Sequence, residues 1–172
     1  MDQLRDVKVN SELIIGLPGE TADSWANTLF KHPELGIDFA RAYPLYVLPN
    51  TPMATIDYRE KHGIKTKKIL LPNNEQFEMI YESKSYDLDE ITQIYLNWWY
   101  FNTFYNFGLD KTITKDKMKD FFASLKDMPF LSCCVEEVKL ALHRIFKPED
   151  ELLLQGYDYY FLHKQLGRGN EL

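Results

Sequence analysis

The sequence predicts an α/β segment followed by an all-helical region. In the first fifty residues, apolar runs suited to buried strands flank a segment whose apolar residues recur with helical spacing. From residue 87 onward the apolar spacing is helical throughout. We therefore divide the chain into residues 1–63, a connector at 64–86 and a helical domain at 87–172.

The first predicted strand covers residues 9–15, which end in a continuous apolar run typical of a strand buried on both faces. A Gly-Leu-Pro-Gly loop at 16–19 separates this strand from a helix. Thr21 is suited to cap that helix, because its hydroxyl can accept a hydrogen bond from a free backbone N–H group. Pro33 and Gly36 mark the end of the helix.

The second predicted strand covers residues 39–48, and Pro44 within it favours an edge position or a bulge. The two strands and the helix form a βαβ unit, with parallel strands and a right-handed crossover. Two parallel strands are not a stable architecture alone, because parallel sheets are normally buried on both faces. We expect the missing strands to come from an N-terminal region or a separate polypeptide. The alternative is that residues 68–71 complete a small three-stranded sheet.

The remaining elements follow from capping residues and apolar spacing. A short helix is predicted from Pro52, capped by Thr51, to Gly63. In the connector, residues 67–71 suit a short strand and 72–74 a turn. Four helices are predicted in the C-terminal region, at 87–107, 114–126, 129–146 and 148–166.

Composition restricts the classes of partner and the compartment. With 26 acidic and 20 basic residues the net charge is −6, which excludes the clustered basic charge that nucleic acids and anionic membranes require. No apolar run approaches the roughly 20 residues that span a bilayer, and the N-terminus has no signal-peptide core. The two cysteines, Cys133 and Cys134, are adjacent and fit a reducing compartment. We expect a cytoplasmic protein that binds neither nucleic acid nor membrane.

The segment from Ile14 to Thr21 is the most informative of the chain. It places a glycine-rich loop between a strand and a helix N-terminus, where α/β proteins bind ligands through outward-pointing N–H groups. It is neither a Walker loop nor a Gly-x-Gly-x-x-Gly fingerprint. An ordinary strand-to-helix turn is the alternative interpretation.

Two segments in a fixed order resemble a known family. Glu12-Leu-Ile-Ile-Gly-Leu-Pro-Gly-Glu-Thr21 and Tyr43-Pro-Leu-Tyr-Val-Leu-Pro-Asn-Thr-Pro52 resemble the last two strands of the radical S-adenosylmethionine barrel. The similarity is greatest to the branch whose members often carry an N-terminal cobalamin-binding domain. Over residues 9–63 the resemblance implies the C-terminal end of a partial (β/α)6 barrel, followed by a helical C-terminal region. Asn50 stands where the family usually has Gly.

The resemblance implies a set of site residues. Both segments line S-adenosylmethionine in the family, the first against its adenine. The residues expected to bind this cofactor are Ile14, Gly16, Gly19, Glu20 and Leu48. Arg41 and Tyr43 are expected to face the barrel interior and a small-molecule or peptide substrate. Arg41 either pairs with a carboxylate there or lies outside as a surface charge.

One required feature of the family is absent from these 172 residues. The family holds a four-iron four-sulfur cluster on three cysteines in CxxxCxxC, whereas this chain has only Cys133 and Cys134. Adjacent helical residues diverge by about 100° and cannot substitute. The histidines are scattered, so we expect no metal ligand in this chain. Alone it is expected to be inactive, and to require the missing N-terminal half or a cluster-bearing partner chain.

In a complete enzyme the resemblance implies reductive cleavage of S-adenosylmethionine to a 5′-deoxyadenosyl radical and hydrogen abstraction. Methyl transfer from methylcobalamin is typical of this branch, which makes cobalamin a further expected cofactor. The competing hypothesis is a non-catalytic interaction module whose strands complete a partner's sheet. A third is a self-contained helical domain in which the glycine loop is incidental.

Aromatic residues gather in two of the predicted helices. Those between Tyr95 and Phe107 surround their helix, which is typical of a helix buried in a core. The functional alternative is an apolar wall over the open barrel mouth. The aromatic residues at 157–161 have the same two interpretations. Cys133 and Cys134 are expected to be small core residues.

Overall fold

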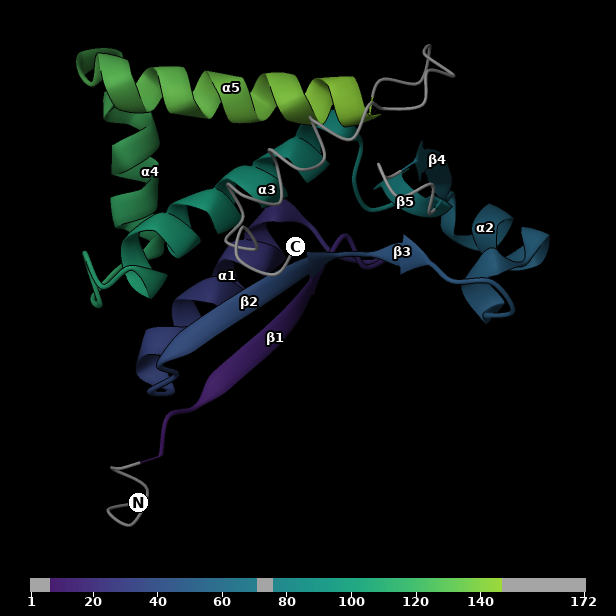
Figure 1. The fold of residues 1–172 in the computed structure, drawn as a ribbon, viewed down its shortest axis with the longest axis horizontal. Coiled ribbons are helices and arrows are strands. Elements are labelled where there is room, and N and C mark those ends of the chain that lie inside the picture. The colour runs from purple at the N-terminus through teal and green to yellow at the C-terminus, as the bar shows by residue number, and fades with distance from the viewer. Residues whose placement is uncertain (1–6, 71–75, 147–172) are drawn as a thin grey trace.

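The computed structural model describes residues 7–70 and 76–146. The turn predicted at 72–74, the helix predicted at 148–166 and the aromatic residues at 157–161 lie outside this part. The described chain contains two small sheets and a group of packed helices (Figure 1). Figure 1 shows α1 and α3 beside the first sheet, α5 crossing above α3, and the second sheet with α2 at the right.

The predicted βαβ unit is confirmed. It consists of β1 (Asn10–Ile15), α1 (Ala22–Glu34) and β2 (Phe39–Pro44), and the two strands pair in parallel. Thr21 caps α1, since its Oγ1 accepts from the Ser24 N–H at 3.1 Å. The second strand is shorter than predicted, because the chain leaves the first sheet after Pro44 and continues in another sheet.

The connector is a β-hairpin that builds this second sheet. Its strands are β4 (Lys65–Leu70) and β5 (Gln76–Glu82), and β3 (Tyr46–Val47) pairs with the other side of β5. All pairings are antiparallel. The alternative that residues 68–71 complete the first sheet is therefore wrong, because β4 pairs with β5.

A short helical segment joins the two strands β3 and β4. A 3₁₀ turn, Pro52–Ala54, precedes α2 (Ile56–His62). Gly63 ends α2 with φ 61°, in the left-handed region that favours glycine. The predicted end at Gly63 is confirmed. The prediction of one helix from Pro52 capped by Thr51 is wrong, because Thr51 makes no side-chain capping bond and the extended backbone at Thr55 separates the 3₁₀ turn from α2, which Thr55 caps.

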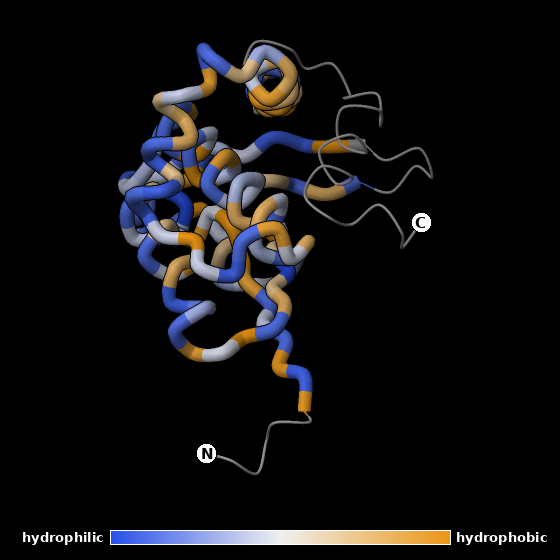
Figure 2. The backbone as a smooth tube through the Cα atoms, turned by 90° about the vertical axis from the view of Figure 1, so that its left-hand side faces the viewer, coloured by the Kyte–Doolittle hydropathy of each residue, from blue (hydrophilic) through white to orange (hydrophobic). Residues whose placement is uncertain are grey.

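The helices of the C-terminal region begin and end close to their predicted limits. They are α3 (Leu88–Phe101), which continues as a π-helical segment (Asn102–Asn106), α4 (Lys115–Ser124) and α5 (Pro129–Phe146). Helix α3 packs against both α1 and α5. Figure 2 shows α5 nearly end-on, with hydrophobic residues on the side that turns toward the other elements.

Helix α3 is the centre of the core, as its aromatic residues predict. Tyr95, Trp98 and Phe101 are at most 1% exposed, and they share one apolar cluster with residues of α1, α5 and both sheets. Phe107 differs, being 71% exposed after the helix has ended. The expectation for the cysteines is wrong for Cys133, whose side chain is exposed on α5, whereas Cys134 is partly buried.

Candidate functional site

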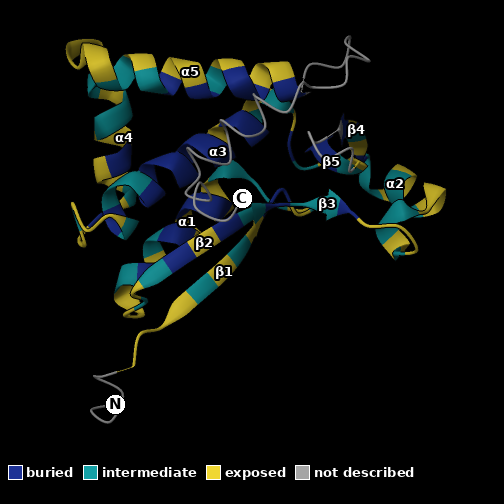
Figure 3. Cartoon of the chain, viewed as in Figure 1, coloured by how far each residue is buried: buried dark blue, intermediate teal, exposed yellow. Residues whose placement is uncertain are grey.

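The parallel sheet has one covered face and one open face. Side chains alternate along β1 and β2, so that Ile15, Ala40 and Ala42 belong to the apolar core with α1 and α3. Glu12 and Arg41, which are register partners, lie exposed on the opposite face. Figure 3 shows that β1 and β2 both carry exposed residues beside more buried ones. Parallel sheets are normally covered on both faces, so this open face is an unusual feature of the described chain.

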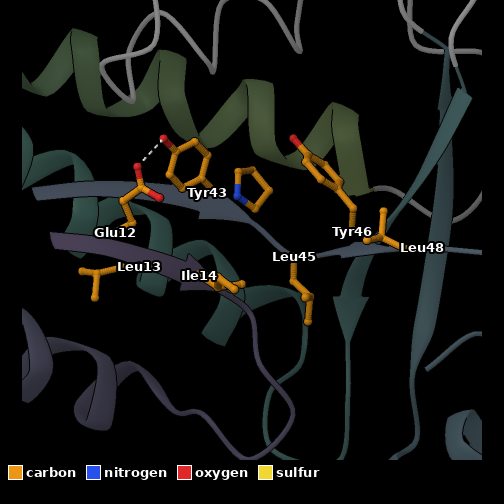
Figure 4. A pocket seen from close by; sticks show the side chains of 8 residues that line it. Glu12, Leu13, Ile14, Tyr43, Leu45, Tyr46 and Leu48 are labelled. Atoms are coloured by element: carbon orange, nitrogen blue, oxygen red, sulfur yellow. Dashed lines mark hydrogen bonds between the residues drawn. The ribbon is translucent and has the colours of Figure 1, made fainter. Parts of the chain in front are cut away.

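A groove of about 610 Å³ follows the open face toward the second sheet. Its lining comes from β1, β2 and the segment after β2, and consists of Glu12, Leu13, Ile14, Tyr43, Pro44, Leu45, Tyr46 and Leu48 (Figure 4). The Tyr43 hydroxyl donates to Glu12 Oε1 at 3.4 Å. An apolar lining with a few polar groups, and a volume of this size, are typical of small-molecule sites.

The groove unites three of the seven predicted site residues. Ile14 and Leu48 are 46% and 60% exposed, and Tyr43 lies beside them in the groove lining. Arg41 lies on the same face outside the groove lining, with its guanidinium 5.9 Å from the centre of the Phe39 ring.

Sequence reasoning missed the other residues of the groove lining. Glu12 lies two residues before Ile14 in β1, so strand alternation alone would have found it. Leu45 and Tyr46 lie where the chain passes from the first sheet to the second. No sequence pattern predicted this change of sheet.

The three remaining predicted residues belong to the loop after β1. Gly16 and Gly19 have φ of 90° and 99°, a region that favours glycine. Glu20 is half-buried, and this burial raises the pKa of its carboxyl while a hydrogen bond with Ser24 opposes the shift. None of the three is part of the groove lining.

The N–H groups of this loop donate within the chain instead of pointing outward. Gly19 N–H donates to Ser85 Oγ at 2.8 Å, and Ala22 N–H, in the first turn of α1, donates to Glu90 Oε1 at 2.7 Å. In the sequence, Asp87 followed by Glu90 three residues later is the pattern of a capping box within one helix. Asp87 does cap α3, at 2.9 Å from the Glu90 N–H, but the Glu90 side chain binds α1.

The two edges of the parallel sheet differ. In β1 the carbonyl of Ile15 accepts from Leu45 N–H at 2.9 Å, so alternate residues turn their backbone groups toward β2. The intervening residues Asn10, Glu12 and Ile14 turn theirs to the other side, where the described chain places no strand. On the outer edge of β2 a side chain binds the backbone instead.

Asn106 lies at the outer edge of β2 and binds both backbone groups of Ala40, at 3.0 and 2.8 Å. Pro44 lies four residues further along β2, and its backbone faces the same outer edge as that of Ala40. Because proline lacks an N–H group, this position leaves no donor without a partner, and the predicted edge position is confirmed. Within the parallel sheet of the described chain, β1 therefore has an edge without a neighbouring strand along its whole length, whereas Asn106 binds part of the edge of β2.

The cluster implied by the family resemblance does not fit the side chains of the described chain. Residues 7–70 and 76–146 contain no group of three or more His, Cys, Asp or Glu side chains that could hold a metal ion. His32 is buried and engaged, with Nε2 2.7 Å from Ser11 Oγ and Nδ1 3.0 Å from the Thr28 carbonyl. In the same part of the chain, no helix is long and apolar enough to span a membrane.

These features define a class of structure: a parallel βαβ unit with one open face, an apolar groove on that face and a free strand edge beside it. No protein-family model matches the chain.

Proposed function

We propose that this chain is the C-terminal portion of a cytoplasmic radical S-adenosylmethionine enzyme, in which it forms the last two strands of a partial (β/α)6 barrel and the helical region that follows. The observation that carries the proposal is the groove on the open face. Ile14 from the first resembling segment and Tyr43 and Leu48 from the second lie together there, although the sequence separates them by about thirty residues.

The lining of the groove suits the adenosine part of S-adenosylmethionine. Ile14, Leu45 and Leu48 offer apolar contacts to a flat base, and the rings of Tyr43 and Tyr46 add aromatic surface. The residues of this chain would bind and orient the nucleoside and exclude water from one side of it. The other side of the groove is open and would be closed by the missing strands.

The residue at position 50 supports the resemblance. Asn50 is the one described residue other than glycine with a positive φ, 63°, in the left-handed region. The family usually has Gly at this position, and Asn is among the side chains that tolerate this conformation best. The departure from the family's pattern therefore preserves the backbone geometry.

The free edge of β1 indicates where the missing strands would add. Asn10, Glu12 and Ile14 offer unpaired backbone groups there, whereas on β2 the Asn106 side chain occupies the edge at Ala40. Strands added at β1 would form the earlier part of the barrel and carry the cluster, which supplies the electron for cleavage of S-adenosylmethionine. Methyl transfer with cobalamin belongs to the same proposal and depends on that other part.

The test is isothermal titration of S-adenosylmethionine into the purified chain, with analytical ultracentrifugation to establish its oligomeric state. Stoichiometric binding by a monomer is expected, and Leu48→Asp should abolish it because a carboxylate would enter the apolar groove. Leu35→Asp is the matched control, since Leu35 is 71% exposed at the end of α1 and outside the groove lining. A well-behaved monomer that does not bind would contradict the proposal.

The free edge of β1 also favours a second function, a non-catalytic module that receives a partner's strand. In that case a partner strand should slow hydrogen exchange at Asn10, Glu12 and Ile14, whose N–H groups face the free edge. Its binding should be insensitive to Leu48→Asp. Self-association of the chain without S-adenosylmethionine binding would favour this alternative.

A further inference from the structure

Residues 83–90, which join β5 to the first turn of α3, lie against the loop that follows β1. Three side chains of this segment bind the backbone of the loop. Tyr86 Oη donates to the Gly16 carbonyl at 2.6 Å, Ser85 Oγ accepts from Gly19 N–H at 2.8 Å, and Glu90 Oε1 accepts from Ala22 N–H at 2.7 Å. The three contacts cover the loop from its first residue to the start of α1.

We propose that Ser85, Tyr86 and Glu90 form a clamp that fixes the loop after β1 and thereby holds Ile14 in the groove. None of the three lines the groove, so they are positioning residues that act through the loop. The part of this inference that concerns a ligand rests on the proposed function. The part that concerns the loop does not.

Close packing at Gly16 supports the clamp. A Cβ at this position would lie 3.3 Å from Tyr86 Oη and 3.4 Å from Ile91 Cδ1, so the loop and the clamp approach as closely as glycine allows. Tyr86 is only 3% exposed. Because a buried hydroxyl without a partner is costly, the bond to the Gly16 carbonyl favours a single arrangement of the loop.

The clamp is itself held on its far side. Ser83 N–H donates to the Tyr86 carbonyl at 2.9 Å, and the hydroxyls of Ser83 and Ser85 lie 2.9 Å apart. Lys84 N–H donates to the carbonyl of His62, the last residue of α2, at 2.8 Å. The position of the loop is therefore tied to the second sheet and to α2.

The clamp also restricts which ligands the loop can take. The carboxylate of Glu90 occupies the N-terminal end of α1, where an anionic ligand is otherwise stabilised by free N–H groups and the helix dipole. A phosphate group would compete with this carboxylate. The clamp thus favours a nucleoside-type ligand without phosphate, held through the apolar groove.

The test compares two buried tyrosines in the full chain by amide hydrogen exchange. Tyr86→Phe removes only the hydroxyl bound to Gly16, and the exchange of the Gly19 and Ala22 amides should accelerate by about 3- to 10-fold, as expected for one lost hydrogen bond. Tyr105→Phe is the matched control, since the Tyr105 hydroxyl donates to the Ile37 carbonyl before β2. It should leave both loop amides unchanged.

A conservative variant tests the role of Glu90. Glu90→Ala should accelerate exchange at Ala22, whereas Glu90→Gln should restore protection, because the amide oxygen still accepts a hydrogen bond. Equal acceleration of loop amide exchange by Tyr86→Phe and Tyr105→Phe would contradict the proposed clamp. So would a failure of Glu90→Gln to restore the protection of the Ala22 amide.

Titration of S-adenosylmethionine into the same variants completes the test. Tyr86→Phe should weaken binding several-fold and Tyr105→Phe should leave it unchanged, and equal affinities for both variants would overturn the positioning role. If the unaltered chain does not bind, the proposed function fails, and the exchange measurement alone decides whether the clamp exists.

Discussion

Asn106 pairs with Ala40 across the outer edge of β2 as a neighbouring strand would. Its Oδ1 accepts from the Ala40 N–H at 3.0 Å, and its Nδ2 donates to the Ala40 carbonyl at 2.8 Å. The same Nδ2 lies 2.7 Å from Asn102 Oδ1, which holds the amide in this orientation. One side chain therefore satisfies backbone groups that would otherwise form an exposed edge.

Replacing this side chain should destabilise the first sheet. Asn106→Ala leaves the N–H and the carbonyl of Ala40 without their partners, and we expect the free energy of unfolding in urea to fall by about 1–3 kcal/mol. Asn27→Ala is the control, because Asn27 is exposed on α1 and should change this free energy by less than about 0.5 kcal/mol. Equal effects of the two substitutions would show that the bonds to Ala40 do not stabilise the sheet.

Substitution of Gly16 and of Gly19 by Ala distinguishes backbone strain from steric contact in the loop after β1. Both have a positive φ, so either substitution by Ala should cost about 1–2 kcal/mol of backbone strain. Only at Gly16 does a Cβ also meet Tyr86 Oη, at 3.3 Å, whereas at Gly19 nothing lies within 4 Å. Urea unfolding should therefore show Gly16→Ala to be the more destabilising of the two. A larger effect at Gly19 would contradict the close packing between Gly16 and Tyr86.

Local signals in the sequence predicted most of the fold. The caps Thr21 and Asp87 were expected from their residue types, and each accepts the N–H of the residue three positions later. The departure of the chain after Pro44 was not predicted. It depends on the pairing of Tyr46 with Met79 in a distant strand, and no local pattern encodes that pairing.

The candidate site was predicted in part for the same reason. Ile14 and Leu48 were expected to bind the cofactor and Tyr43 to face the substrate, and the three line one groove. The loop was expected to offer free N–H groups, but Glu90 takes the one at Ala22. This contact joins residues 68 positions apart, and a Glu three residues after a cap normally indicates a capping box within its own helix.

Tyr86 should make the stability of the chain sensitive to alkaline pH. Burial raises the pKa of its phenol above the usual 10.0, the charge of Glu20 adds to this shift, and a hydrogen bond with Ser83 opposes it. Above about pH 10 the unfolded chain releases this proton while the folded chain retains it, so the free energy of unfolding falls as pH rises. Below that pH the group makes no pH-dependent contribution.

Urea unfolding between about pH 10 and 11 checks this expectation, since one group contributes at most about 1.4 kcal/mol per pH unit. The pKa values of Tyr100 and Tyr105 are also raised by burial, so the variant without the Tyr86 hydroxyl should retain part of the dependence of its unfolding free energy on pH. Tyr86→Phe should make the fall of the unfolding free energy with pH less steep. An unchanged slope would show that the Tyr86 phenol ionises equally well in the folded chain.

Glu90 should act as the anion at the N-terminal end of α1. Glu90→Ala removes the carboxylate that accepts from Ala22 N–H at 2.7 Å, and we expect it to lower the free energy of unfolding by about 1–2 kcal/mol. Inorganic phosphate should recover part of this loss in the variant, because the freed N–H and the helix dipole attract an anion. Thermal unfolding in phosphate and in chloride at equal ionic strength measures the recovery.

Glu34→Ala, at the opposite end of α1, should show no response to phosphate, and neither should the unaltered chain. A response of the unaltered chain as large as that of Glu90→Ala would mean that this carboxylate does not occupy the anion position.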